Sequence, residues 1–234
     1  MQRYFGKEKK ENNMILESGD MHHIKKVMRM KDGDEIEVVV NGKLYLCNLK
    51  NNLETIVIKK ELEIPKDFMK YITLVIPVLK EQKMDLILQK ATELGVTEII
   101  PVSMKRSMVK IGEKEEKKLE RWNKIMKEAS EQSMRNCIPK LQSVTTFSEI
   151  TKLEGLKIIC STREKENTFK KLLQTSTNYD KLIIVIGPEG GLDIEEEKLL
   201  EKYNFIPVTL GPRIMRVETV PIYVLSVLNY EYME

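Results

Sequence analysis

The sequence has few of the residues that build metal sites. Its 234 residues include three cysteines and two histidines. Cys47, Cys137 and Cys160 are isolated from one another, and the adjacent His22 and His23 have no partners at metal-ligand spacing. Zinc sites need several such ligands close together, so the sequence predicts no metal centre. A sparse, odd number of cysteines is also typical of proteins from a reducing compartment.

Long apolar runs and an excess of one charge are also missing. No stretch reaches the ~20 apolar residues needed to span a bilayer, and the N-terminus shows no apolar signal run. We therefore expect a soluble, cytoplasmic protein. The 39 basic and 36 acidic residues leave a net charge of +3, so any affinity for nucleic acid must come from local patches.

The first part of the chain, residues 1–68, is expected to form a small β-barrel. Asn41-Gly42 separates two β-rich runs, 35–40 and 43–47, and both residues of this pair tolerate the positive φ of a type I′ hairpin. Another β-rich run covers residues 55–58. Several short strands in so short a segment favour a barrel.

One helix is expected to interrupt these strands, near residues 20–30. At helical spacing, Ile24, Val27 and Met28 share one apolar face. The opposite face is basic and consists of His22, Lys25, Lys26 and Arg29. Such a face can contact the RNA backbone, although exposed basic residues are more often simply solvated.

The remaining residues, 69–234, are expected to form an α/β domain. Apolar runs at 72–76, 98–102, 156–160, 182–186 and 206–210 alternate with helical patterns at 84–94, 116–135, 167–173, 194–203 and beyond 219. This alternation predicts a mostly parallel sheet covered by helices. The boundary between the two domains is expected near residues 64–67.

A glycine-rich loop, Gly187-Pro188-Glu189-Gly190-Gly191, follows the most apolar of these runs and precedes a helix. In open α/β sheets, ligands bind beyond the carboxyl ends of the strands, and glycines let the backbone approach them closely. The alternative is a tight turn without a ligand. The loop lacks the lysine and hydroxyl pair of a phosphate loop and the Gly-x-Gly-x-x-Gly dinucleotide pattern, which argues against a nucleotide hydrolase. Glu189 instead favours a cationic ligand, and S-adenosylmethionine, with its sulfonium and ammonium groups, meets this description.

A second Gly-Pro loop lies one helix later, from Leu210 to Thr219. Because it also follows a strand, the two loops can form two walls of one pocket. Arg213 and Arg216 offer planar donors for a phosphate or a base edge. The alternative is that they are surface arginines at a helix start, with Thr219 as its N-cap.

Together these loops, Gly187-Pro188-Glu189-Gly190-Gly191 and Leu210-Gly211-Pro212-Arg213-Ile214-Met215-Arg216-Val217-Glu218-Thr219, resemble the signature of the RsmE family. Other segments resemble the family in the same order, among them residues 3–5, 22–29, 88–96, 106–110, 121–125 and 128–133. The family consists of SPOUT-class enzymes that use S-adenosylmethionine to methylate N3 of a uridine in 16S ribosomal RNA. The resemblance implies an N-terminal PUA-like barrel, a C-terminal trefoil-knotted domain with a mostly parallel sheet, and a homodimer.

The resemblance also assigns residues to roles. Those implied to bind S-adenosylmethionine are Ser161, Thr162, Ile186, Gly187, Pro188, Glu189, Gly190, Gly191, Leu210, Gly211, Ile214, Met215 and Arg216. The candidate RNA-binding residues are Arg3, His22, Lys25, Lys26, Arg29, Arg106 and Lys110.

Methylation of a neutral uracil at N3 needs either a general base or an environment that stabilises the anion. Glu189 and Glu218 are the candidate bases, and Arg213 and Arg216 are the candidate anion-stabilising residues. Two alternatives remain open at this point. One is a catalytically silent RNA-binding protein of the same fold, and the other is a methyltransferase for another structured RNA, such as transfer RNA or large-subunit RNA. The substrate is expected to be ribosomal RNA in the assembled small subunit.

Overall fold

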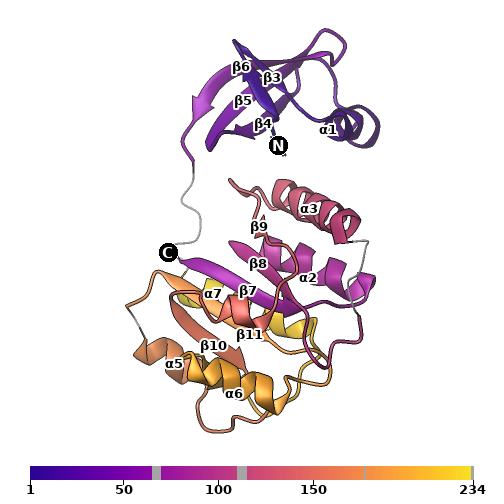
Figure 1. Ribbon diagram of the computed structural model, residues 1–234. Helices are drawn as coiled ribbons and strands as arrows, with labels where there is room; N and C mark the ends of the chain where they lie inside the picture. Colours follow the sequence, from indigo (N-terminus) through magenta and orange to yellow (C-terminus); the bar gives the residue numbers. More distant parts are fainter. Residues whose placement is uncertain (65–69, 110–114, 177, 233–234) are drawn as a thin grey trace. The chain divides into compact units, whose positions relative to one another are not determined.

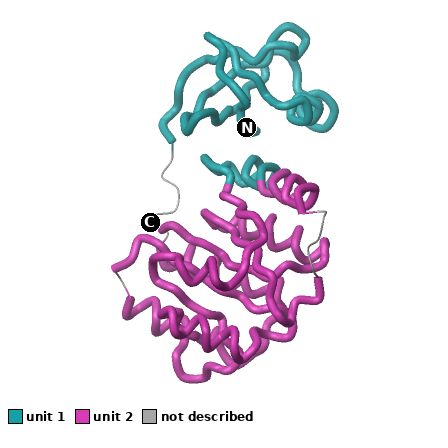
Figure 2. Tube along the Cα trace, in the orientation of Figure 1, with its two compact units in different colours: residues 1–67, 127–138 teal, residues 68–126, 139–234 magenta. Residues whose placement is uncertain are grey.

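The structure is a computed structural model, and it describes residues 1–64, 70–109, 115–176 and 178–232. It has two compact units (Figure 2). One comprises residues 1–67 with 127–138, and the other comprises residues 68–126 with 139–234. The sequence-based division instead placed 127–138 with the C-terminal domain, because a helix that continues from one unit into another leaves no break in its pattern. Of the expected boundary, residues 65–67 lie outside the described residues.

The first unit contains one six-stranded sheet in the order β1-β4-β5-β6-β3-β2. Its strands are β1 (Gln2–Phe5), β2 (Glu8–Lys10), β3 (Asn13–Ile15), β4 (Glu35–Val40), β5 (Lys43–Lys50) and β6 (Thr55–Leu62). β1 runs parallel to β4, and the other pairs are antiparallel. The predicted hairpin between β4 and β5 is confirmed, since Asn41 and Gly42 have φ values of 49° and 72°.

The helical segment of this unit differs from the prediction. α1 (Ser18–His22) continues into a π-helical turn, His23–Val27. Ile24 is fully buried as expected, but Val27 and Met28 are exposed, so the predicted apolar face is wrong beyond Ile24. A π-helix has more residues per turn than an α-helix, so side chains three and four apart no longer share one face.

The second unit contains a six-stranded, wholly parallel sheet in the order β12-β10-β11-β7-β8-β9 (Figure 1). Its strands are β7 (Tyr71–Pro77), β8 (Glu98–Val102), β9 (Lys140–Leu141), β10 (Leu156–Cys160), β11 (Lys181–Ile186) and β12 (Ile206–Val208). The prediction of an α/β domain with a mostly parallel sheet is confirmed. β9 was not anticipated, since two residues are too few to form a recognisable pattern.

The helices of this unit are α2 (Glu81–Glu93), α3 (Glu115–Gln132), α4 (Phe147–Ile150), α5 (Phe169–Thr175), α6 (Ile194–Lys202) and α7 (Thr219–Tyr232), and the end of α3 belongs to the first unit. α2 packs against α7. Ile150 of α4 and Leu200 of α6 join a buried cluster with strand residues such as Val185. Among the described residues, no helix is long and apolar enough to cross a membrane.

The strand order decides where the functional site forms. β7, β11, β10 and β12 are successive neighbours and run in the same direction. Their carboxyl ends therefore meet at one edge of the sheet. As a result, the start of α2 and the loops after residues 160, 186 and 208 lie next to one another, although they are far apart in the sequence.

Candidate functional site

A cavity with two lobes lies at this edge of the sheet. The first lobe, of about 370 Å³, is lined by Lys83, Cys160, Ser161, Thr162, Ile186, Gly187, Pro188, Glu189, Gly191, Leu192, Glu197, Ile214, Met215, Arg216, Val217 and Val220. The second, of about 520 Å³, is lined by Cys160, Ser161, Thr162, Lys165, Thr168, Thr209, Leu210, Gly211, Pro212, Arg213, Ile214, Met215 and Val220. Because the lobes share lining residues from two loops, they are two parts of one site.

The structure thus brings both Gly-Pro loops to one cavity, as expected from the sequence. Of the residues expected to bind S-adenosylmethionine, all but Gly190 line one lobe or both. Among the candidate catalytic residues, Glu189 and Arg216 line the first lobe and Arg213 lines the second. Glu218 is not among the lining residues of either lobe.

The first loop, residues 187–191, is tightly folded. A Cβ atom on Gly187 would lie 2.8 Å from the backbone nitrogen of Leu192, closer than real Cβ contacts allow, so only glycine fits there. Gly191 has a φ of 69°, which favours glycine, and its N–H donates to the carbonyl of Pro188 at 2.8 Å. These two glycines therefore allow the compact turn that the loop adopts.

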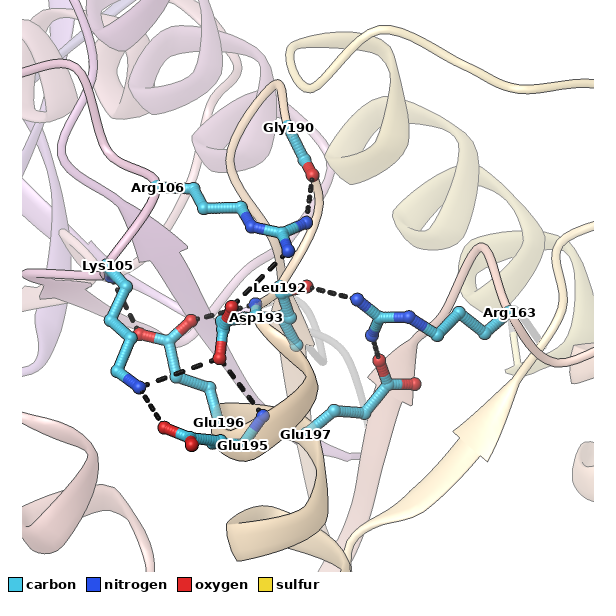
Figure 3. Close-up of polar contacts among 9 residues, drawn as sticks. All are labelled: Lys105, Arg106, Arg163, Gly190, Leu192, Asp193, Glu195, Glu196 and Glu197. Atoms are coloured by element: carbon cyan, nitrogen blue, oxygen red, sulfur yellow. Dashed lines mark hydrogen bonds and ion pairs between the residues drawn. The ribbon is translucent and has the colours of Figure 1, made fainter.

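Two arginines from other segments brace this loop (Figure 3). Arg106, which follows β8, donates to the carbonyl of Gly190 at 3.0 Å and to Asp193 at 3.3 Å. Arg163, which follows β10, donates to the carbonyl of Leu192 at 2.7 Å and forms an ion pair with Glu197. The sequence does not predict these contacts of Arg106, which was expected to bind RNA.

The start of α6 is fixed by a capping box. The side chain of Asp193 accepts from the N–H of Glu195 at 3.1 Å, and the N–H of Asp193 donates to Glu196 at 3.0 Å. The hydrogen bond from Glu195 and the nearby Lys105 and Arg106 lower the pKa of Asp193, which stays ionised. The first loop is thus anchored at its carboxyl end by charged contacts (Figure 3).

Buried groups line the floor of the cavity. The Ser161 hydroxyl donates to the buried carboxylate of Glu197 and accepts from the N–H of Arg163 at 3.1 Å. Cys160 is half-buried and lines both lobes, and desolvation raises the pKa of its thiol to about 12. This thiol is therefore protonated at neutral pH and is a poor nucleophile.

Lys83 connects the two candidate carboxylates. Its Nζ lies 3.0 Å from Oε1 of Glu189 and 3.4 Å from Oε2 of Glu218. Partial burial opposes ionisation of Glu189, but hydrogen bonds from its own backbone amide and from Lys83 outweigh it and lower the pKa. The hydrogen bond to Glu189 raises the pKa of Lys83 despite partial desolvation. Lys83 therefore stays a cation and Glu189 an anion at neutral pH.

The second loop makes fewer contacts of its own. Gly211 has a φ of 120°, and its N–H lies 3.3 Å from the hydroxyl of Thr209. Arg213 and Arg216 are exposed, and within the described ranges their guanidinium groups have no hydrogen bond or ion pair. Ile214 is 87% exposed, an unusual state for an apolar side chain at the rim of a cavity. Helix α7 starts at Thr219, so Thr219 lies one position inside the helix instead of at the expected N-cap.

The candidate RNA-binding residues have different fates. His22, Lys25, Lys26 and Arg29 are exposed, so their basic side chains can be reached from solvent. Arg3 is buried and bonded to Glu37, to the carbonyl of Met134 and to Asn136, so its assignment to RNA binding is wrong. The sequence could not predict this burial, because the hydrogen-bond acceptors of Arg3 are all distant from it along the chain. Lys110 lies outside the described residues.

Several lining residues were not among the predicted site residues, notably Lys83, Lys165, Glu197 and Val217. Lys83 was the one that could have been found. It lies in the first turn of α2, the helix that follows β7. Because the carboxyl ends of neighbouring parallel strands meet at one edge of the sheet, this turn is expected to lie near the two loops. Glu197 lies inside α6, where an acidic residue usually faces solvent, so its burial gives no signal in the sequence.

Comparison with known proteins shows the family of this chain. The profile of the family described as "RNA methyltransferase domain" matches residues 66–229, and that of "RNA methyltransferase PUA domain" matches residues 16–61. The chain is 35% identical to Ribosomal RNA small subunit methyltransferase E of Bacillus subtilis, over 99% of this chain and 97% of that protein. It is also 35% identical to the protein of the same name from Mesomycoplasma hyopneumoniae, over 97% and 98%. The chain belongs to the ribosomal RNA small subunit methyltransferase E family.

Solved structures confirm the fold of this methyltransferase E family member. The Ribosomal RNA small subunit methyltransferase E of Neisseria gonorrhoeae, solved with bound S-adenosylmethionine, is 29% identical with a TM-score of 0.87, over 99% of this chain and 98% of that chain. A Legionella pneumophila methyltransferase, solved with the same cofactor, is 28% identical with a TM-score of 0.88, over 98% and 97%. The predicted family, the PUA-like N-terminal domain and the class of RNA methyltransferase are thus confirmed.

Proposed function

We propose that this chain methylates N3 of a uridine in 16S ribosomal RNA and holds S-adenosylmethionine in the cavity between its two Gly-Pro loops. The observation that carries this proposal is the convergence of both loops, and of the segment after β10, on one two-lobed cavity. Relatives that cover nearly the whole chain carry the name of a small-subunit ribosomal RNA methyltransferase.

The lining of the cavity suits this cofactor. Glu189 and Glu197 give the first lobe carboxylate oxygens that can accept hydrogen bonds from the ammonium group of the ligand. Each carboxylate is already paired with a cation, Glu189 with Lys83 and Glu197 with Arg163. Ile186, Leu192 and Val217 give the same lobe apolar walls that can cover a flat adenine ring. The glycines leave backbone groups open to the ligand, because no side chain shields them.

The bound cofactor supplies an electrophilic methyl group, so the main task of the chain is to position the uracil and remove its N3 proton. Glu189 lines the cavity, but its lowered pKa makes it a weak base at neutral pH. Glu218 does not line either lobe. We therefore favour loss of the N3 proton to solvent water, with the resulting uracil anion stabilised by Arg213 and Arg216, over proton removal by either glutamate.

The first unit is proposed to bind RNA. This unit has exposed basic side chains at His22, Lys25, Lys26 and Arg29, and the PUA profile covers this segment. We further propose that the substrate is the assembled small subunit, that the protein acts as a cytoplasmic homodimer, and that the last loops form a trefoil knot. The exposed Ile214 beside the cavity supports the dimer, since a partner subunit would cover its apolar surface.

Mass spectrometry of nucleosides from 16S RNA tests the proposal. RNA from cells that lack this protein should have no N3-methyluridine, and purified protein with S-adenosylmethionine should restore it on isolated small subunits. Methylation of another RNA, or of another atom of uracil, would contradict the proposal. So would the absence of calorimetric binding of S-adenosylmethionine, which would instead indicate a catalytically silent RNA-binding protein.

A further inference from the structure

Lys83, in α2, forms ion pairs with both loops of the cavity. It lies in the first turn of the helix and itself lines the first lobe. Its Nζ lies 3.0 Å from Glu189, in the loop after β11, and 3.4 Å from Glu218, which ends the loop before α7. Both carboxylates therefore lie against one nitrogen, although they come from separate segments of the chain.

We propose that Lys83 is a positioning residue that ties the two loops together at the spacing that the methyl donor needs. The inference rests on the proposed function, since it takes S-adenosylmethionine as the ligand. It assigns to Lys83 a role in the shape of the cavity and no contact with the reacting atoms.

The charges of the three groups explain why the tie matters. Lys80 also places positive charge near Glu189, but Lys83 lies within 3.4 Å of both carboxylates. Without Lys83, Glu189 and Glu218 would lose this shared cation, and like charges at short range repel. Oε2 of Glu218 is buried and lacks a hydrogen bond of good geometry, so the ion pair with Lys83 is its compensation. The two carboxylates would relieve their repulsion by moving apart, and each would carry its loop with it.

A second effect of removing Lys83 has the opposite sign. S-adenosylmethionine carries a net positive charge, so the loss of a cation from the cavity would strengthen its electrostatic attraction. S-adenosylhomocysteine, which remains after the methyl group has left, has no net charge. Its affinity therefore reports the spacing of the loops without this added attraction.

Calorimetric titration of the full chain with both compounds tests the inference. We expect Lys83→Met to weaken S-adenosylhomocysteine roughly tenfold, within the range typical of coupling between neighbouring elements, and to weaken S-adenosylmethionine less. Lys83→Arg, which keeps the charge and the reach, should recover affinity to within about threefold. Lys83→Gln is the second neutral variant, in case the methionine variant does not fold. Unchanged affinity for S-adenosylhomocysteine in either neutral variant would overturn the inference.

Removal of the two carboxylates separates a tie between loops from a direct contact with the ligand. In a Glu189→Gln/Glu218→Gln background the two side chains no longer repel each other. Lys83→Met should therefore change the affinity for S-adenosylhomocysteine by less than about twofold in this background. An effect that stays tenfold in this background would also overturn the inference. Lys90→Met is the matched control, because Lys90 lies on the same helix and forms an ion pair with Glu93 at 2.8 Å. Neither Lys90 nor Glu93 lines the cavity. If the wild-type chain binds neither compound, the proposed function itself fails.

Discussion

Both loops of the cavity contain a Gly-Pro pair and lie at the same edge of the sheet, yet they are held in different ways. The first loop is fixed by Gly187, by two arginines from other segments and by a capping box at the start of α6. The second presents Arg213, Ile214 and Arg216 to solvent, and the part of the chain that the structure describes offers their side chains no polar partner. The comparison indicates a division of labour. The braced loop suits a ligand that needs a preformed wall, and the second suits a substrate that brings its own charge.

The largest expected effect breaks the first loop from within. Gly187→Ala would place a Cβ atom 2.8 Å from the nitrogen of Leu192, so the loop must shift. We expect binding of S-adenosylmethionine to weaken about 10- to 100-fold, since overpacking of a tight site costs about 1–3 kcal/mol. Calorimetric titration measures it. Gly190→Ala in the same loop is the control, because its Cβ would be no closer than 3.5 Å to the Arg106 side chain. Equal effects of Gly187→Ala and Gly190→Ala would contradict the explanation by close packing at Gly187.

The next effect concerns the second loop. Arg213→Met removes an exposed guanidinium that lines the second lobe, so the unfolding midpoint should not change. We expect kcat/KM for methylation of small-subunit RNA to fall roughly 10- to 100-fold. This is less than the roughly 100- to 1,000-fold typical of losing a preorganised charge-stabilising donor, because Arg213 is exposed and its charge is screened by solvent and salt. A methyl-transfer assay on isolated subunits measures the rate, and thermal unfolding measures the stability. A lower unfolding midpoint with an unchanged rate would mean that Arg213 stabilises the fold and does not act on the substrate, which would contradict the role given to the second loop.

Removal of an arginine that braces the first loop should instead lower the stability of the fold. Arg163→Met leaves the buried carboxylate of Glu197 without its ion pair. The free energy of unfolding should fall by about 1–3 kcal/mol, toward the low end because Arg163 is partly exposed. Denaturant unfolding measures it, and Arg163→Met/Glu197→Gln should recover part of the loss. No recovery would mean that the contact of Arg163 with the Leu192 carbonyl dominates.

The smallest effect is a pH dependence of the Lys83–Glu189 pair. The pKa of Glu189 is lowered from 4.5, so its contribution to stability is present above that value and is lost as the pH falls through the folded-state pKa. The pKa of Lys83 is raised from 10.5, so its contribution is present below that value and is lost as the pH rises through the folded-state pKa. The difference in unfolding midpoint between wild type and Lys83→Met should therefore be constant from pH 5 to pH 9, within the window that 4.5 and 10.5 define. A change near neutral pH would contradict this assignment of charges.

The sequence predicted the sheet and the two loops because these depend on local patterns. The apolar runs that became β7, β10 and β11 alternate with helical patterns, and both loops carry glycine and proline at the ends of strands. The braces could not be predicted in the same way. Arg106 lies 84 positions from the Gly190 carbonyl that it contacts, and nothing local marks that pairing.

Local patterns also misled in the first unit. Val27 and Met28 have the spacing of an apolar face, but the π-helical turn moves them into solvent. Arg3 belongs to a segment that resembles the family, yet its acceptors include Asn136, which is distant in the sequence. Burial and long-range pairing depend on the folded chain, so the local periodicity of a single sequence does not predict them.

A crystal structure of the protein with S-adenosylmethionine would test the central claim most directly. The account predicts that the cofactor occupies the cavity between the two loops, against Gly187 and Gly191 on one side and Met215 and Arg216 on the other. The first loop should keep its contacts with Arg106 and Arg163. A cofactor bound elsewhere, or bound with only one of the loops, would contradict the account.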